Sequence, residues 1–333
     1  MTEAKADKEA GKKRKWHWKE LLAVIFLIGA TFFFWQQRKE LATLGKSLQH
    51  TNLLWLSVGI AFTVVYVLLQ AALYIYSFYA VGANISLKDA IELFLRRNVI
   101  AVFLPGGGLT ALAYVPTNIK SRQQNPEQVH HASVIYGFIG IFSVFIVAIP
   151  VLMYLTLQET HIPGMTAGFI TMLVMLVAIV VFIRSVQVRG KFYSWAIRKR
   201  PKVETFLNEV FTFDLIWKQF WYAVIVSVFI EVVGVIHLYI SMLAAGVPGS
   251  LTASIVGYIV ATIFLIISPF LRGLGAIEMS LTFILKGYGY STVHAFQISL
   301  LFRLFEFWLP LIAGLFYYAD KGRKLLSRLL PTK

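Results

Sequence analysis

Charged residues inside long apolar stretches are the part of this sequence best suited to binding chemistry. The set comprises Glu92, Arg96, Arg97, Glu231, Arg272, Glu278, Arg303 and Glu306. A charged side chain at the centre of a membrane helix costs about 2.5–3.5 kcal/mol on insertion scales, so each of these residues is a functional candidate. Arginine binds phosphate as a rigid fork, and a carboxylate can match a cationic amino group. The two signs together predict recognition of a polar, charged headgroup inside a membrane.

Several of these charges also have a purely structural explanation, and both alternatives stay open. Arg303 and Glu306 are three residues apart, so they share a helix face and either pair with each other or line a substrate path. Glu278 follows a glycine turn, where it either caps a helix start or pairs with Arg303 or a cationic headgroup. Glu231 lies near the middle of its apolar run and is expected to pair with an arginine.

The adjacent arginines Arg96 and Arg97 present a similar choice. They either extend to the membrane interface as ordinary anchors or grip a phosphate group. His237, in the same apolar run as Glu231, is interpreted as a packing residue.

Two glycine-rich segments, LPGGG (104–108) and SPFLRGLG (268–275), interrupt the apolar stretches. Proline removes a backbone donor and glycine permits a positive φ, so each segment can turn and expose amides to a ligand. Irregular backbone at membrane depth is tolerated only when it is buried in protein or lines a wet cavity. Substrate contacts are therefore also expected at the turn residues Gly106, Gly107, Gly108, Arg272, Gly273 and Gly275.

The composition requires a membrane around these residues, because 58% of the chain is hydrophobic and only 14% is charged. Several apolar runs are long enough to cross a bilayer, which takes about 20 residues. The candidate spans are 20–36, 53–81, 132–157, 165–184, 215–245 and 293–319. Two shorter runs, 88–104 and 251–267, each end at a Pro/Gly break. The expected fold is an all-α polytopic membrane protein with about six full spans plus two re-entrant helical hairpins.

The hairpins would pair 88–104 with 106–122 and 251–267 with 274–287. The alternative is that both arms of each pair cross the membrane completely. Each pair would then add two crossings, so the orientation of the loops does not distinguish the two arrangements.

The net charge of +15 is distributed as in a membrane protein, and no nucleic-acid partner is expected. Lys and Arg cluster in 5–19, 184–202 and 321–333, next to apolar runs, as cytoplasmic loops do. The expected organisation is a basic tail (1–18), a membrane domain (19–320) and a second basic tail (321–333). Both termini would be cytoplasmic, in a cell (cytoplasmic or inner) membrane, with the basic segments near anionic lipid headgroups.

Familiar catalytic and cofactor chemistry is not indicated. The chain has no cysteine, and its seven histidines form no metal-binding pattern. A nucleotide-binding motif is also absent from the sequence. We therefore expect no catalytic residue, metal or cofactor.

The regions around the two predicted hairpins repeat each other. Gly82 matches Gly246, Ser86 matches Ser250 and Pro105 matches Pro269, all at one constant shift along the chain (246 − 82, 250 − 86, 269 − 105). The repeats would span about 53–157 and 215–319, the first starting on an inward helix and the second on an outward one. Inverted repeats with broken helices are typical of alternating-access transporters.

Two stretches, GANISLKDAIELFLRRNVIAVFLPGGGLTALAY and RGLGAIEMSLTFILKGYGYSTVHAFQISLLFRLFEFWLPLIAGL, resemble the lysylphosphatidylglycerol synthase/flippase transmembrane family. The resemblance covers roughly 50–320. Its more specific motif comprises Gly273, Gly275, Glu278, Gly287, Gly289, Ala295, Arg303, Pro310 and Gly314. The resemblance implies an eight-segment flippase-like domain that moves aminoacylated phospholipid to the outer leaflet. In that family a separate soluble domain charges the lipid from aminoacyl-tRNA.

This chain departs from the family pattern in three places. It ends at LLSRLLPTK without the soluble transferase domain, so synthase activity is not expected. The second turn has Phe270, Leu271 and Arg272 where the family is rich in glycine. The first turn is followed by LTALAY, where the family has a basic residue.

The favoured function is a flippase-like transporter of a phospholipid, such as aminoacylated phosphatidylglycerol, or of another lipid-linked substrate. The alternatives are an intramembrane lipid-modifying transferase and a membrane scaffold for a separate lipid enzyme. An enzyme would change the mass of the lipid, and a scaffold would survive neutralisation of the buried charges. The partners to consider are membrane phospholipid, a second copy of the chain in a homodimer, and a lipid-synthesis enzyme.

Overall fold

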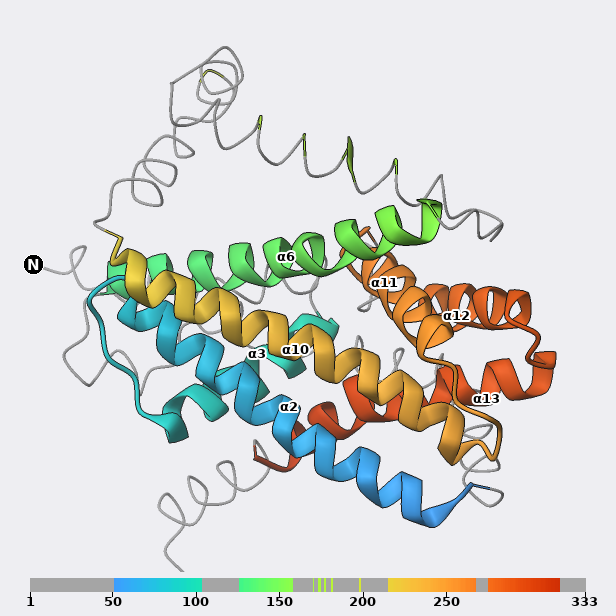
Figure 1. The fold of residues 1–333 in the computed structure, drawn as a ribbon. Helices are drawn as coiled ribbons and strands as arrows, with labels where there is room; N and C mark the ends of the chain where they lie inside the picture. Colours follow the sequence, from blue (N-terminus) through green and yellow to red (C-terminus); the bar gives the residue numbers. More distant parts are fainter. Residues whose placement is uncertain are drawn as a thin grey trace, which may run out of the picture. The chain divides into compact units, whose positions relative to one another are not determined.

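The computed structural model describes residues 51–103, 126–157, 215–267 and 275–317, with six isolated positions between 170 and 198. All of these residues belong to one compact unit, His50–Lys333. Within the described ranges the regular elements are helices, and no strand occurs (Figure 1). They are α2 (Leu53–Tyr79), α3 (Leu87–Phe103), α6 (Pro126–Leu157), α10 (Trp217–Ala244), α11 (Leu251–Ile267), α12 (Ala276–Gly287), α13 (Thr292–Arg303) and the π-helix η2 (Leu304–Trp308).

Four described helices are long and apolar enough to cross a membrane, which confirms a multi-pass helical protein. They are Leu53–Tyr79, Gln128–Val151, Trp217–Ala244 and Thr292–Tyr317, the last running from α13 through η2. These spans correspond to four of the six that the sequence predicts. The predicted span 20–36 lies outside the described residues, and 165–184 is described only at isolated positions. Both predicted tails, 1–18 and 321–333, are also outside them.

Helices α2 and α10 run antiparallel and share the most extensive helix–helix contact (Figure 1). The backbone N–H of Asn52, just before α2, donates to the carbonyl oxygen of Ala244 at the end of α10 at 2.9 Å. Reciprocally, the N–H of Ile216, just before α10, donates to the carbonyl of Ala80, just after α2, also at 2.9 Å. Each helix start is thus bonded to the other helix's end, where backbone groups lack intrahelical partners.

These two hydrogen bonds are related by the same shift along the chain that the sequence repeat shows (216 − 52 and 244 − 80). The shift also relates the first residues of α2 and α10 (217 − 53). The first residues of α3 and α11 follow it as well (251 − 87). The equivalent glycines Gly82 and Gly246 end the two long helices with positive φ of 70° and 76°. The two regions therefore have matching helix boundaries.

Helix α12 is too short to cross the hydrocarbon core at right angles. It has 12 residues, or about 18 Å at 1.5 Å per residue, against roughly 30 Å of hydrocarbon. Helix α12 packs against both α11 and α13. It corresponds to the predicted arm 274–287, whereas the arm 106–122 and the turns 104–108 and 268–274 lie outside the described residues.

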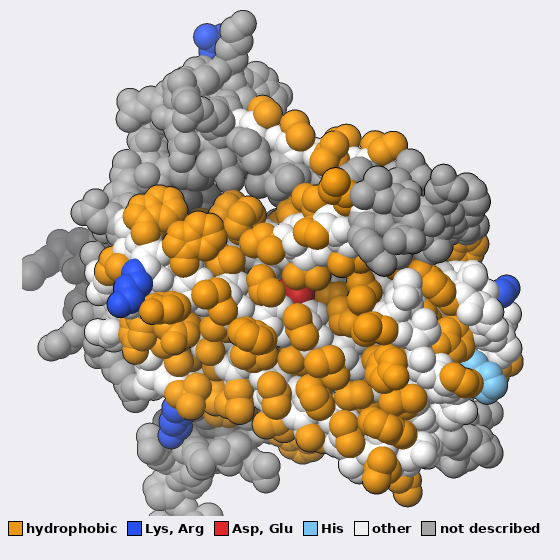
Figure 2. Space-filling model, viewed as in Figure 1, with side chains coloured by type: hydrophobic (Ala, Val, Ile, Leu, Met, Phe, Trp, Pro, Cys, Tyr) orange, Lys and Arg blue, Asp and Glu red, His pale blue; other side chains and the backbone are white. Residues whose placement is uncertain are grey.

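The exposed side of α10 carries a stripe of large apolar residues. Trp217, Trp221, Ile225 and Phe229 recur every four residues, and each is more than half exposed. Figure 2 shows that apolar side chains dominate this face of the molecule. A contiguous apolar surface of this kind is suited to contact with lipid chains.

Between α2, α3, α6 and α10 the interior is apolar, with Leu73, Phe78, Leu93 and Ile139 almost fully buried.

Candidate functional site

Glu278 and Arg303 form a buried ion pair between α12 and α13. Arg303 Nε donates to Glu278 Oε1 at 2.7 Å, and each side chain is only 4% exposed. The guanidinium also lies over the ring of Phe307, 4.4 Å from its centroid. Glu278 Oε2 is buried and has no hydrogen-bond partner among the described residues. Of the sequence alternatives for Glu278, the pairing with Arg303 is therefore confirmed, with one carboxylate oxygen left to bind something else.

A positive-φ glycine places Glu278 at this position. Gly275 precedes α12 with φ of +82°, which an L-residue adopts only with strain. Glu278 lies in the first turn of α12, where the helix dipole favours a negative charge. The turn that precedes this glycine includes Arg272 and Gly273, which lie outside the described residues.

A second buried pair joins α10 to the π-helix η2. His237 Nδ1 and Glu306 Oε1 are 2.6 Å apart, with His237 fully buried and the Glu306 side chain 14% exposed. His237 Nε2 has no hydrogen-bond partner in the described part of the chain. The imidazole is enclosed by the rings of Phe62, Tyr66 and Phe305. A proton on Nδ1 would let the ring donate to the Glu306 carboxylate.

The π-turn in η2 begins directly after Arg303 and contains Glu306, and it explains why these two residues pair with different helices and not with each other. Phe305 lies within η2, and its carbonyl is 3.3 Å from Thr63 Oγ1, which also lies 3.0 Å from the Gly59 carbonyl and shares its one proton between the two. A Cβ at Gly59 would overlap the Phe305 ring, so this glycine allows α2 to approach the π-turn closely. π-turns are frequent at functional sites. The sequence alternative of an Arg303–Glu306 pair is corrected here: Arg303 pairs with α12 and Glu306 with α10.

Glu231 on α10 is surrounded by hydroxyl groups. Ser143 Oγ of α6 donates to Glu231 Oε1 at 2.8 Å, and Tyr258 of α11 donates to Glu231 Oε2 at 2.9 Å. Ser227 Oγ in turn donates to Ser143 Oγ at 2.8 Å. The expected arginine partner of Glu231 is wrong for the described residues, because the carboxylate accepts from hydroxyls instead. Gly234 makes this contact possible, since a Cβ there would overlap the Tyr258 ring.

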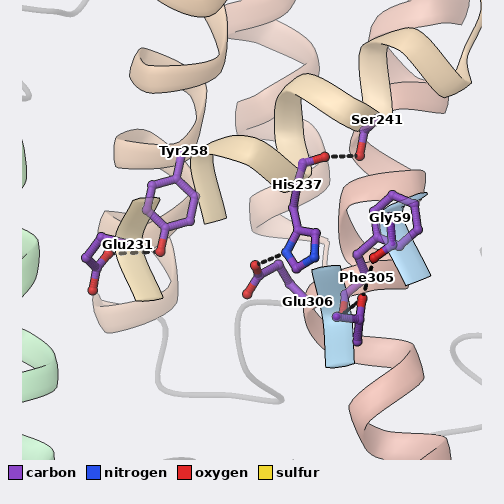
Figure 3. A network of polar contacts seen from close by, with 8 residues as sticks. Gly59, Glu231, His237, Ser241, Tyr258, Phe305 and Glu306 are labelled. Atoms are coloured by element: carbon purple, nitrogen blue, oxygen red, sulfur yellow. Dashed lines mark hydrogen bonds and ion pairs between the residues drawn. The ribbon is translucent and has the colours of Figure 1, made fainter. Parts of the chain in front are cut away.

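Glu231 and the His237–Glu306 pair form one polar network in the membrane interior. Figure 3 shows Glu306 between the His237 ring and the Glu231–Tyr258 pair. Two carboxylates, an imidazole and a phenol from α10, α11 and η2 therefore lie in one region of the protein.

The adjacent arginines of α3 have different partners. Arg97 is 3% exposed and donates from Nη2 to Ser133 Oγ at 2.7 Å and from Nη1 to the Tyr74 hydroxyl at 3.3 Å. Arg96 pairs with Glu92 at 2.7 Å, and the side chain of Arg96 is 12% exposed. Both arginines thus have partners inside the protein, and the interpretation as interfacial anchors stays a prediction. The phosphate-binding alternative stays a prediction.

Five of the predicted substrate-binding residues lie outside the described part of the chain. They are Gly106, Gly107, Gly108, Arg272 and Gly273. Among the residues that are described, no group of three or more His, Asp or Glu side chains could hold a metal ion.

Sequence reasoning missed Ser143, Tyr258 and the role of His237. One usable signal existed, because Ser227 and Glu231 are four residues apart on α10 and so share a helix face. The other partners come from distant helices, which no local pattern identifies.

The apolar helices and the buried ionic groups define a multi-pass α-helical membrane protein with a polar interior. The family model described as Lysylphosphatidylglycerol synthase TM region matches residues 21–314. The chain belongs to this family, which confirms the resemblance found in the sequence and indicates a function related to membrane lipid. A search of curated proteins and a search of solved structures gave no match.

Proposed function

We propose that the protein is a flippase-like transporter that moves a phospholipid, or another lipid-linked substrate, between the leaflets of the membrane. The observation that carries the proposal is the buried Glu278–Arg303 pair, with its second carboxylate oxygen unsatisfied in the described part of the chain. Groups this expensive to bury are retained in membrane helices for substrate or ion pathways. Membership of a lipid-related membrane family supports the same conclusion.

The pair suits a lipid headgroup because it offers both signs of charge. Arg303 can bind a phosphate oxygen, and Glu278 can accept from an amino group such as that of an aminoacylated phosphatidylglycerol. The acyl chains would stay in the bilayer beside the apolar surface while the headgroup crosses through the protein. Transport would leave the lipid chemically unchanged, whereas a lipid-modifying enzyme would change its mass. We propose transport.

The architecture supports such a cycle through an inverted repeat. The reciprocal bonds Asn52–Ala244 and Ile216–Ala80 join antiparallel helices at one constant shift along the chain (216 − 52, 244 − 80), as a two-fold axis in the membrane plane would require. In this arrangement α11 and α12 form a re-entrant hairpin, in agreement with the short length of α12. Two halves of this kind can expose one central site to each side in turn.

Both ends of the chain would lie in the cytoplasm of a cell, because the termini and the 184–202 loop are basic and anionic headgroups attract them. A second copy of the chain or a lipid-synthesis enzyme would be the natural protein partner. Neither partner is needed for the assay below.

The test is lipid transfer by the purified full chain in liposomes. Headgroup-labelled anionic, zwitterionic and aminoacylated phospholipids are followed by a membrane-impermeant quencher, and the lipids are weighed by mass spectrometry afterwards. Glu278→Gln and Arg303→Lys should lower the transfer rate at least tenfold. Lys286→Ala is the matched control, because Lys286 is an exposed residue on the same helix as Glu278. Absence of transfer for every lipid, or a change in lipid mass, would refute the proposal.

A further inference from the structure

Glu231 differs from the other buried glutamates in having no cationic partner among the described residues. Glu92, Glu231 and Glu278 are all 3–5% exposed. Glu92 pairs with an arginine of α3, and Glu278 pairs with an arginine of α13. Glu231, by contrast, receives only hydroxyl hydrogen bonds from the residues that the structure describes. Among the described residues its charge is therefore balanced by hydroxyl dipoles, on a helix long and apolar enough to cross the membrane.

The hydroxyls around Glu231 can serve both protonation states. When the carboxylate is ionised, Ser143 donates to Oε1 as described. When it is protonated, its O–H can donate to Ser143 Oγ, because Ser143 has a second acceptor, the Gly140 carbonyl at 3.1 Å. Ser227 can keep donating to Ser143 in either state, since a hydroxyl oxygen accepts two hydrogen bonds. Turning one serine hydroxyl is sufficient to accommodate the proton.

The helices packed against α10 contribute defined groups, and the charged residue of α13, Arg303, is already paired with Glu278. Helix α6 supplies Ser143, and α11 supplies the Tyr258 phenol. The second carboxylate, Glu306, comes from η2 and is held by His237 of α10 itself. Helix α2 contributes Tyr66, whose ring lies against the imidazole. No arginine or lysine is paired with these carboxylates among the described residues, so uptake of a proton by Glu231 removes a negative charge that no ion pair balances there.

We propose that Glu231 is a proton-binding site, and that the uptake and release of one proton there is coupled to lipid translocation. Binding converts the carboxylate and a proton from water into the neutral acid, so the charge at Glu231 changes from −1 to 0. The neutral form can move past apolar surface during a conformational change at lower cost than the ion. The coupling rests on the proposed transport function, whereas the proton site does not.

Proton binding is measured without transport, by infrared difference spectroscopy of the full chain in lipid nanodiscs over a range of pH. The expected result is a carbonyl band of a protonated carboxylic acid that titrates with pH and is lost in Glu231→Gln. Glu92→Gln is the matched control and should keep the band, because Glu92 is equally buried but paired with arginine. A missing band, or one that survives in Glu231→Gln, would overturn the proton site.

Coupling is measured in proteoliposomes with and without an imposed pH gradient. The gradient should raise the rate of headgroup-labelled phosphatidylglycerol transfer severalfold in the wild type and leave the rate of Glu231→Gln unchanged. If the wild-type transfer rate is the same with and without the gradient, the coupling is wrong and the transport function stands. If no labelled lipid crosses but the infrared band titrates, transport and coupling are both wrong and the proton site stands.

Discussion

Removing Arg303 alone should destabilise the protein far more than removing Arg303 and Glu278 together. In Arg303→Met the Glu278 carboxylate stays buried, at 3% exposure, after losing the Nε donor 2.7 Å away. Breaking one side of a buried ion pair costs about 3–5 kcal/mol. In the double variant Glu278→Leu with Arg303→Met no charge remains, and such replacements are close to neutral or stabilising by about 1–4 kcal/mol.

The assay combines thermal unfolding in detergent with the liposome transfer measurement. The single variant should unfold at a clearly lower temperature than the wild type, and the double variant should recover most of the loss. If the pair binds the lipid headgroup, the recovered double variant should still transfer no lipid. This separates the contribution of the pair to stability from its contribution to transport.

Two results would refute the reasoning. A double variant as unstable as the single one would mean that the two side chains are not a buried pair. A stable double variant that transfers lipid at the wild-type rate would remove the pair from the transport mechanism.

Three further substitutions test the backbone around the site by thermal unfolding. Gly234→Ala should cost about 1–3 kcal/mol, because its Cβ would overlap a packed aromatic ring; Gly140→Ala, with nothing within 4 Å of the added Cβ, should not destabilise. Gly275→Ala should cost of order 1–3 kcal/mol, because φ is +82° there; the same change at Gly287, where φ is not positive, is the control, and equal losses would contradict the strain argument. Thr63→Val removes the hydroxyl that donates to the π-turn and should cost about 0.5–1.5 kcal/mol; an unchanged unfolding temperature would show that the π-turn does not depend on it.

Much of the helical frame could be predicted from the sequence, because its signals are local. The four described spans follow from length and hydropathy alone. The starts of α3 and α11 follow from Ser86 and Ser250, whose hydroxyls accept from the N–H groups of Asp89 and Ala253 at 3.2 Å. A repeated motif of glycine and serine at a fixed shift is visible without any structure.

The partners of the buried charges could not be predicted, because they depend on how distant helices pack. Arg303 and Glu306 are expected on one face of a regular helix, but the π-turn directs them to different neighbours. Glu231 could accept from Tyr258 only once Gly234 let α11 approach α10. No residue preference marks a π-turn in advance, and no sequence spacing links positions 231 and 258.

The constant shift along the chain that relates α2 to α10 (217 − 53) also bears on how the polar interior could have evolved. At this shift the position equivalent to Glu231 is Val67, and the position equivalent to Arg97 is Ala261. Equivalent positions in the two halves thus hold a charged residue in one half and a small or apolar residue in the other. The helix starts follow the repeat and these charged positions do not, so the helical frame and the charges could have arisen at different stages of evolution.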